Sequence, residues 1–172
     1  MRASGSPCVA VFGLGGTIAM TQAPGGGVSP ALTASDLVAA VPGLSDLRAE
    51  LRIRDFRNKP GASLDFTDLY ELAAAIDQAL NDGCVGAVVT QGTDTIEEVA
   101  YALDLLLPTD APVVVTGAMR NPTMAGTDGP ANILAAIRVP SSPRAMVARP
   151  MCALRRGTGL RAGDRRRIRT GM

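Results

Sequence analysis

Short apolar runs alternate with amphipathic stretches over the first 138 residues of this 172-residue chain. Nearly continuous apolar runs are typical of buried parallel strands, whereas apolar positions three or four residues apart indicate helices. A run in which apolar and polar residues alternate indicates a half-covered edge strand. The sequence therefore predicts strands at 8–12, 51–56, 85–90 and 112–116, and helices at 33–41, 67–81, 95–107 and 130–137.

The order of these elements predicts the fold class. Strands that alternate with helices and are themselves almost wholly apolar favour an α/β fold of three layers, with a mainly parallel sheet and helices on both faces. Thr33 is the expected N-cap of the first helix, and Pro130 suits the first turn of the last. The glycine-rich segment 13–30 is predicted to be a mobile loop.

Residues 139–172 break this pattern. They hold nine arginines and a single acidic residue, Asp164, and they contain no apolar run long enough to predict a strand. We therefore expect an incomplete α/β domain at 1–138, followed by a disordered or frameshift-derived tail at 139–172. A basic arm that binds nucleic acid is the alternative, but the tail has no Phe, Tyr or Trp to stack on bases, which disfavours it.

Composition excludes several classes of site. The chain has no histidine, so Ser-His-Asp and Cys-His catalytic units and His-based metal sites are excluded within it. The three cysteines have no CxxC spacing and are expected to be buried apolar residues in a reducing cytosol. No apolar run approaches the roughly 20 residues of a membrane span. We therefore predict a cytoplasmic protein that uses no metal and no cofactor.

Three polar, glycine-containing turns follow predicted strands. In open parallel sheets, ligand sites form beyond the carboxyl ends of the strands. The first two turns carry the hydroxyls of Thr17 and Thr93 and the carboxylate of Asp94, and the third carries Arg120; each also has a purely structural interpretation as a tight turn, a helix cap or a solvated cation. A dinucleotide-binding turn would need a small residue where this chain has Ile18. The turns lie at 13–19, 90–95 and 116–122.

Four motifs together carry a family resemblance. They read LGGTIA, QGTDTIEE, VTGAMR and DGPAN, at 14–19, 91–98, 115–120 and 128–132. In this order and spacing they resemble the bacterial-type L-asparaginase/glutaminase family, threonine amidohydrolases that cleave a side-chain amide. The resemblance covers about residues 8–138. It implies a truncated N-terminal domain, because members of the family are about twice as long and carry a C-terminal domain that is absent here.

The resemblance also implies roles for individual residues. Thr17 is similar to the family's primary nucleophile, and Thr93 and Asp94 to its second catalytic threonine and the adjacent carboxylate, which also bind the substrate's α-amino and α-carboxylate groups. Ser63 resembles the substrate-binding serine, with Ala62 as the alternative position. The resemblance implies that the substrate is L-asparagine or L-glutamine and that no cofactor is needed. It also implies that the protein forms a homo-oligomer.

Some positions depart from the family's pattern. Leu14 replaces a threonine, Gln91 replaces a histidine, and residues 18–69 contain no tyrosine to activate the nucleophile. The single lysine, Lys59, precedes Asp94, whereas the family's catalytic lysine follows it. We therefore expect impaired activity. A non-catalytic remnant or regulator and a nucleotide-binding Rossmann module stay open as alternatives.

Overall fold

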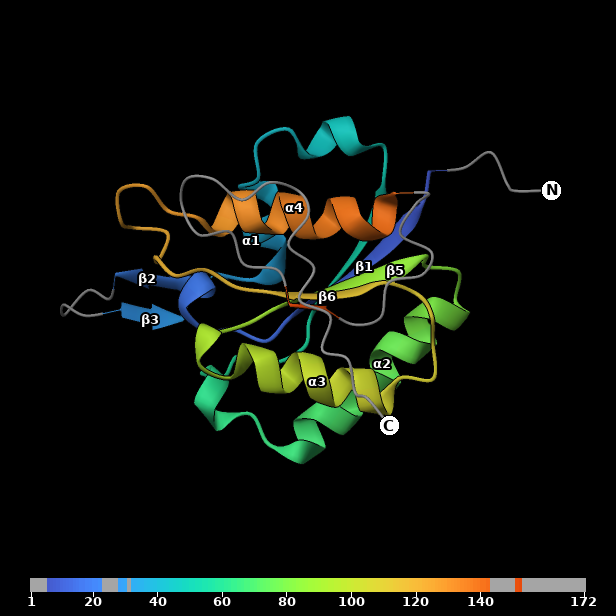
Figure 1. Ribbon diagram of the computed structural model, residues 1–172. Coiled ribbons are helices and arrows are strands. Elements are labelled where there is room, and N and C mark those ends of the chain that lie inside the picture. Colours follow the sequence, from blue (N-terminus) through green and yellow to red (C-terminus); the bar gives the residue numbers. More distant parts are fainter. Residues whose placement is uncertain (1–5, 23–27, 31, 143–150, 153–172) are drawn as a thin grey trace.

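A computed structural model describes residues 6–22, 28–30, 32–142 and 151–152 (Figure 1). Its main sheet has five strands in the order β4-β1-β5-β6-β7, and every neighbouring pair is parallel. The central strands β1, β5 and β6 are wholly buried because they are almost purely apolar. The predicted α/β fold with a parallel sheet is confirmed. The strands are β1 (Cys8–Gly13), β4 (Glu50–Asp55), β5 (Gly86–Thr90), β6 (Val113–Thr116) and β7 (Met151–Cys152).

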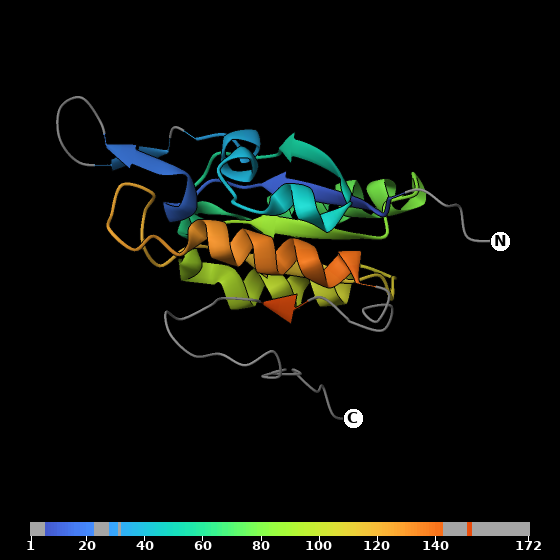
Figure 2. The same ribbon diagram turned by 90° about the horizontal axis from the view of Figure 1, so that it is seen from above.

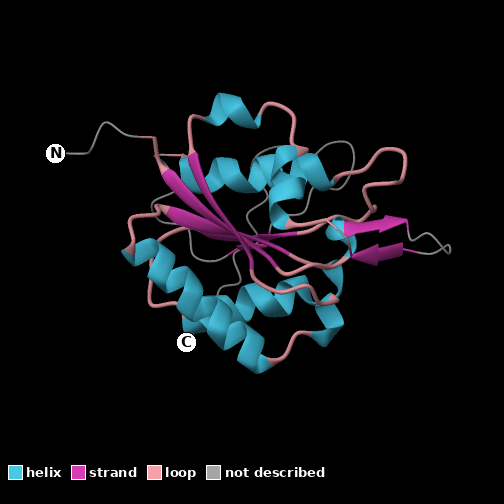
Figure 3. Cartoon of the chain, turned by 180° about the vertical axis from the view of Figure 1, so that it is seen from behind, coloured by secondary structure: helices cyan, strands magenta, loops and turns pink. Residues whose placement is uncertain are grey.

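Helices cover both faces of the sheet. Helices α1 (Ala34–Ala39) and α4 (Gly129–Ser141) lie on one face, and α2 (Phe66–Asn81) and α3 (Ile96–Leu106) lie on the other (Figure 1). Figure 3, seen from behind, shows the same layers around the twisted strands, and Figure 2 looks down on the face that carries α4. The three-layer arrangement is therefore as predicted.

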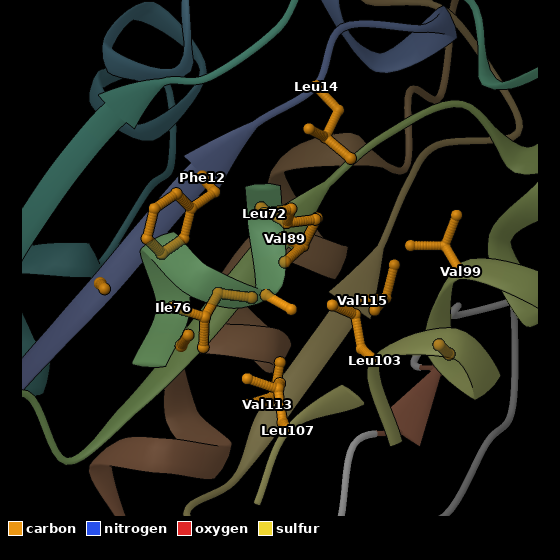
Figure 4. Close-up of a cluster of buried hydrophobic side chains, with 14 of the residues drawn as sticks. Phe12, Leu14, Leu72, Ile76, Val89, Val99, Leu103, Leu107, Val113 and Val115 are labelled. Carbon is orange, nitrogen blue, oxygen red and sulfur yellow. The ribbon is translucent and has the colours of Figure 1, made fainter. Parts of the chain in front are cut away.

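The alternation of side chains along β1 explains why two cores form. Val9 and Val11 belong to the cluster beneath α1 and α4, whereas Ala10 and Phe12 belong to the cluster beneath α2 and α3. Figure 4 shows the second cluster, in which side chains from α2 and α3 meet those of the strands. Both faces of β1 are therefore covered, which is why its sequence shows no polar alternation.

Local capping fixes where two helices begin. Thr33 is the N-cap of α1 and forms a capping box with Asp36, as the sequence predicts for the cap. Asp65 caps α2 in the same way through Asp68. Since each box pairs a side chain with backbone N–H groups that lack helical partners, both helices start at a residue set by the sequence.

The glycine-rich segment after β1 is more ordered than predicted. A short 3₁₀ helix, η1 (Thr17–Ala19), leads into β2 (Met20–Gln22), which pairs antiparallel with β3 (Val28–Pro30). The hairpin projects past the carboxyl end of β1 (Figures 1 and 2). The prediction of a mobile loop over 13–30 is therefore wrong for these elements, because three-residue strands are too short to produce a hydrophobic pattern; residues 23–27 lie outside the described part.

The expected end of regular structure at residue 138 is also wrong. Helix α4 continues to Ser141, with Pro140 in its last turn, and β7 adds a parallel strand to the outer edge of β6. A two-residue strand gives no period, so the sequence could not reveal it. The rest of the predicted tail, 143–150 and 153–172, lies outside the described residues.

Candidate active site

The sheet order defines one place where a ligand site is expected. From β1 the chain moves to β4 on one side of β1, and later to β5 on the other side. In open α/β sheets, ligands bind outside the carboxyl ends of the strands at the point where the strand order reverses. Here that point lies between β1 and β5, which are followed by η1 and by the 3₁₀ helix η4 (Thr93–Thr95).

The backbones of these two turns are in direct contact. Gly16 has a φ of +83°, and a Cβ added to it would overlap the backbone N and Cα of Gly92. Only glycine permits both this left-handed conformation and this close approach. Because Thr17 follows Gly16 and Thr93 follows Gly92, the structure brings the two threonine-bearing segments together.

A third segment joins this contact. The 3₁₀ helix η3 (Gly61–Ser63) packs against η4, and the hydroxyl of Thr95 donates a hydrogen bond of 3.1 Å to the carbonyl of Gly61. Ser63 and Asp94 are exposed and Thr93 is partly exposed. Their side chains are therefore accessible to a small molecule in solution. The predicted residues Ser63, Thr93 and Asp94 thus lie on neighbouring turns.

The turn after β6 is the fourth segment at this end of the sheet. A Cβ on Gly117 would lie 2.6 Å from the carbonyl oxygen of Gln91 and 3.3 Å from Cγ2 of Thr93. The backbone of Gly117 therefore also approaches the second threonine closely. Ile18 lies within 3.3 Å of the Cβ position of Gly129, at the start of α4. All four sequence motifs consequently meet at one end of the sheet.

Asp128 and Asn132 organise the turn after β6. The Asp128 carboxylate accepts hydrogen bonds from the backbone N–H groups of Met119 at 3.1 Å and Arg120 at 3.0 Å. The amide of Asn132 donates to the carbonyl of Gly117 at 2.9 Å. Burial raises the pKa of Asp128, but the N–H groups donating to it outweigh burial, so its pKa lies below the ordinary value.

The guanidinium of Arg120 has a structural role in the same loop. Its Nη1 lies 3.4 Å from the carbonyl oxygens of Ala125 and Gly126, and the residue is exposed. The sequence predicted neither this contact nor the Asp128–Asn132 pair as organisers of the site. Both depend on the folded shape of the loop between β6 and α4, and only the VTGAMR and DGPAN motifs indicated that this region belongs to the site.

Gln91 lies buried between the turns. Its backbone N–H donates to the carbonyl of Thr116 at 3.0 Å, and its side-chain Nε2 donates to the carbonyl of Gly92 at 3.1 Å. The residue has no exposed surface, and its Oε1 finds no hydrogen-bond partner among the described residues. Gln91 therefore acts as an amide donor and anchors the peptide that precedes Thr93.

Lys59 follows strand β4 and pairs with a carboxylate on helix α2. Its Nζ forms an ion pair of 2.6 Å with Asp68 on α2, and Arg57 pairs with the other carboxylate oxygen at 2.7 Å. The hydrogen bonds from these two cations, of which that from Lys59 has the larger effect, hold the pKa of the Asp68 carboxyl well below its usual range. The only lysine of the chain is thus committed to Asp68.

The described residues show no group of three or more Cys, Asp or Glu residues that could hold a metal ion. None of the described helices is both long and apolar enough to cross a membrane.

The alternative of a dinucleotide-binding turn is disfavoured by Ile18. Its side chain is buried against Ala118 and Gly129, where that motif needs a small residue.

The strand order and the four converging turns define a doubly wound α/β domain with a candidate site at its switch point. The family model described as "Asparaginase, N-terminal" matches residues 8–167. The chain therefore belongs to the asparaginase family. Since the match continues to residue 167, the expectation that the resemblance ends near residue 138 is wrong.

Individual relatives agree with this assignment. The chain is 40% identical over 166 residues to L-asparaginase 2-3 of Saccharomyces cerevisiae, covering 94% of this chain and 43% of the relative. It is 36% identical over 148 residues to L-asparaginase 2 of Bacillus subtilis, covering 81% of this chain and 38% of the relative. The chain thus spans less than half the length of these curated relatives.

A solved structure shares the fold. It is described as a probable cytoplasmic L-asparaginase from Campylobacter jejuni, and the match has a TM-score of 0.77 at 34% identity. The match covers 86% of this chain and 44% of that chain. This likeness places the present chain on one half of a longer asparaginase fold.

Proposed function

We propose that this chain is an asparaginase-type amidohydrolase domain that uses Thr17 as its nucleophile. The observation that carries the proposal is the backbone contact between Gly16 and Gly92, which sets the segment that begins at Thr17 against the segment that begins at Thr93. Two hydroxyls and one carboxylate at a switch point suit a small polar substrate. The names of the relatives, L-asparaginases, support L-asparagine as that substrate.

The proposed reaction has two halves. The Thr17 hydroxyl attacks the side-chain amide carbon, its proton passes to the leaving nitrogen, and the C–N bond breaks to release ammonia. The resulting ester between Thr17 and the aspartyl group is then cleaved by water, which returns the proton to Thr17 and yields L-aspartate. Backbone N–H groups of the converging turns would stabilise the oxyanion formed in each half.

Binding of the substrate is assigned to the exposed residues of the neighbouring turns. The Asp94 carboxylate is the partner for the α-ammonium group, and the hydroxyls of Thr93 and Ser63 are partners for the α-carboxylate. Because L-glutamine is longer by a single methylene, discrimination against it is expected to be modest. We place the protein in the cytoplasm, in line with the description of the Campylobacter jejuni structure.

Activation of Thr17 is the weak step of this chain. A threonine hydroxyl is a poor nucleophile until a base removes its proton. Gln91 cannot accept that proton as an imidazole would, and Lys59 is paired with Asp68. Loss of members of a cooperating catalytic unit costs about 10³ to 10⁶ in rate. We therefore propose that the chain binds its substrate but turns it over slowly.

The test combines binding with turnover on the full 172-residue chain. Calorimetry should detect binding of L-aspartate, and ammonia release from L-asparagine should fall at least 10³-fold below an ordinary rate of about 10 per second. Asp94→Asn should weaken the binding, whereas Asp104→Asn, on α3, is the matched control and should leave it unchanged.

Turnover identifies the nucleophile. Thr17→Ala should abolish the residual ammonia release while leaving L-aspartate binding in place, and Thr17→Ser should retain part of the release. Ammonia release by Thr17→Ala at the wild-type rate would contradict the assignment of the nucleophile. Binding without any turnover in the wild type would instead support the alternative of a non-catalytic remnant or regulator.

A further inference from the structure

Two cysteines lie in contact at the end of the sheet opposite the candidate active site. Cys8 is the first residue of β1, and Cys84 lies two residues before β5 begins. Both are buried and free, and their Sγ atoms are 2.7 Å apart. The contact is held in place by the backbone, because the N–H of Val85 donates to the carbonyl of Cys8 at 2.8 Å.

We propose that Cys8 and Cys84 form a redox-active pair that closes to a disulfide on oxidation by a peroxide. A disulfide bond is about 2.05 Å long, so the two sulfurs need to approach each other by less than about 1 Å. Cys8 and Cys84 lie where β1 begins and just before β5, at a point already joined by the hydrogen bond from Val85 to Cys8, so the approach is a small local adjustment.

The chemistry balances with hydrogen peroxide as the oxidant. One thiolate attacks a peroxide oxygen and the O–O bond breaks, which gives a sulfenic acid and one water after proton transfer. The second thiol then attacks the sulfenic sulfur, and the S–O bond breaks to release a second water. Two electrons pass from the thiols to the peroxide, which is a small neutral molecule that can reach a buried pair.

One neighbouring charge favours a thiolate in the pair, whereas burial opposes it. Arg52, on the neighbouring strand β4, is the nearby cation, and a thiolate charge on Cys8 or Cys84 raises the pKa of Arg52. Burial and the contact with Cys8 raise the pKa of the Cys84 thiol to about 12. Oxidation should therefore be slow at neutral pH and accelerate as the pH rises, because the thiolate is the reactive form.

The disulfide would link the two strands that carry the candidate site at their other ends. It would join positions 76 residues apart, and closing so long a loop restricts the unfolded chain. We therefore expect oxidation to raise the melting temperature by about 5–15 °C. The pair would thus act as a clamp on β1 and β5 that closes under oxidising conditions.

The test measures the link directly on the full chain. After treatment with hydrogen peroxide, the intact mass should fall by two hydrogen atoms. Trypsin should then yield a linked pair of peptides, one spanning 3–48 with Cys8 and the other spanning 58–120 with Cys84, which a reducing agent separates. Cys152 lies on a different tryptic peptide, so the map also shows which cysteines have paired.

Cys152→Ala provides the matched control, because it removes the third cysteine and leaves the pair intact. This variant should still lose both titratable thiols on oxidation and show the same rise in melting temperature. Cys84→Ala should show no such rise. A gain of oxygen atoms without the loss of two hydrogens, a link that involves Cys152, or two thiols that persist after oxidation at pH 9 would overturn the proposal.

Discussion

Lys59 connects the turn after β1 to helix α2 through Asp68. Its backbone N–H donates to the carbonyl of Leu14 at 2.9 Å, while its Nζ pairs with the Asp68 carboxylate at 2.6 Å. Asp68 itself is almost wholly buried, with 5% of its side chain exposed. The ion pair therefore links the segment that precedes η1 to helix α2.

Asp68→Asn should destabilise the fold. The substitution leaves Lys59 and Arg57 without their shared anion, although both cations keep partial access to water, which reduces the cost. We expect a loss of about 1–3 kcal/mol in the free energy of unfolding, measured by urea denaturation. Glu71→Gln is the matched control, because Glu71 pairs with the same Arg57 from an exposed position. A loss as large in Glu71→Gln as in Asp68→Asn would contradict the importance of the buried carboxylate.

The same carboxylate predicts a pH dependence. The pKa of Asp68 is lower in the folded state than its ordinary value, so its contribution to stability is complete above about pH 4 and declines as the pH falls below it. The difference in urea midpoint between wild type and Asp68→Asn should therefore be constant from pH 5 to 8 and shrink as the pH falls below the ordinary pKa of about 4. A difference that persists unchanged at pH 3 would count against the ion pair.

Gly16→Ala should be poorly tolerated. An added Cβ has no room beside the backbone of Gly92, and the φ of +83° adds conformational strain. We expect a loss of about 2–4 kcal/mol in the free energy of unfolding.

Gly83→Ala is the matched control for this variant, because Gly83 has a φ of +97° but no atom within 4 Å of its Cβ position. It should cost only the strain, about 1 kcal/mol. If the two alanine variants were equally stable in urea denaturation, the close approach of the two turns would be refuted.

The sequence predicted those parts of the fold that repeat a pattern over a full element. Helix α2 shows apolar residues at helical spacing over sixteen residues, and it begins one residue before the predicted start. Strands β2, β3 and β7 have three residues or fewer, and their pairing depends on backbone hydrogen bonds, which most residue types can form. No periodicity can reveal such strands.

The candidate site likewise has parts that the sequence predicted and parts that it could not predict. The turns that bear Thr17 and Thr93 stand out as glycine-containing motifs at strand ends, and the structure brings them together. The residues that hold these turns in place, such as Asp128 and Lys59, form side-chain contacts with positions eight and nine residues away, a separation that matches neither a helical nor a strand period. A single sequence gives no signal for such contacts, because many other residues along the chain could form a hydrogen bond or an ion pair with the same side chain.

Gln91→Glu tests how the turn before Thr93 is held. The substitution exchanges Nε2 for an oxygen at a site with no exposed surface, facing the carbonyl of Gly92. An ionised carboxylate there would be repelled by that carbonyl, whereas a protonated one can donate a hydrogen bond to it as the amide does. Burial therefore raises the pKa of the new carboxyl in the folded state above its value of about 4.3 in the unfolded chain.

The sign of the resulting pH dependence follows from this shift. A group with a raised folded-state pKa keeps its stabilising contribution below the unfolded pKa and loses it as the pH rises. Gln91→Glu should match wild type near pH 4 and lose up to about 1.4 kcal/mol per pH unit above pH 5, until the folded-state pKa is passed. Gln91→Met, which has no titratable group and a similar volume, should show a constant difference from wild type over the same range. Urea midpoints for Gln91→Glu that run parallel to those of Gln91→Met from pH 4 to 8 would show that the side chain at position 91 reaches water, contrary to the buried anchor that the structure describes.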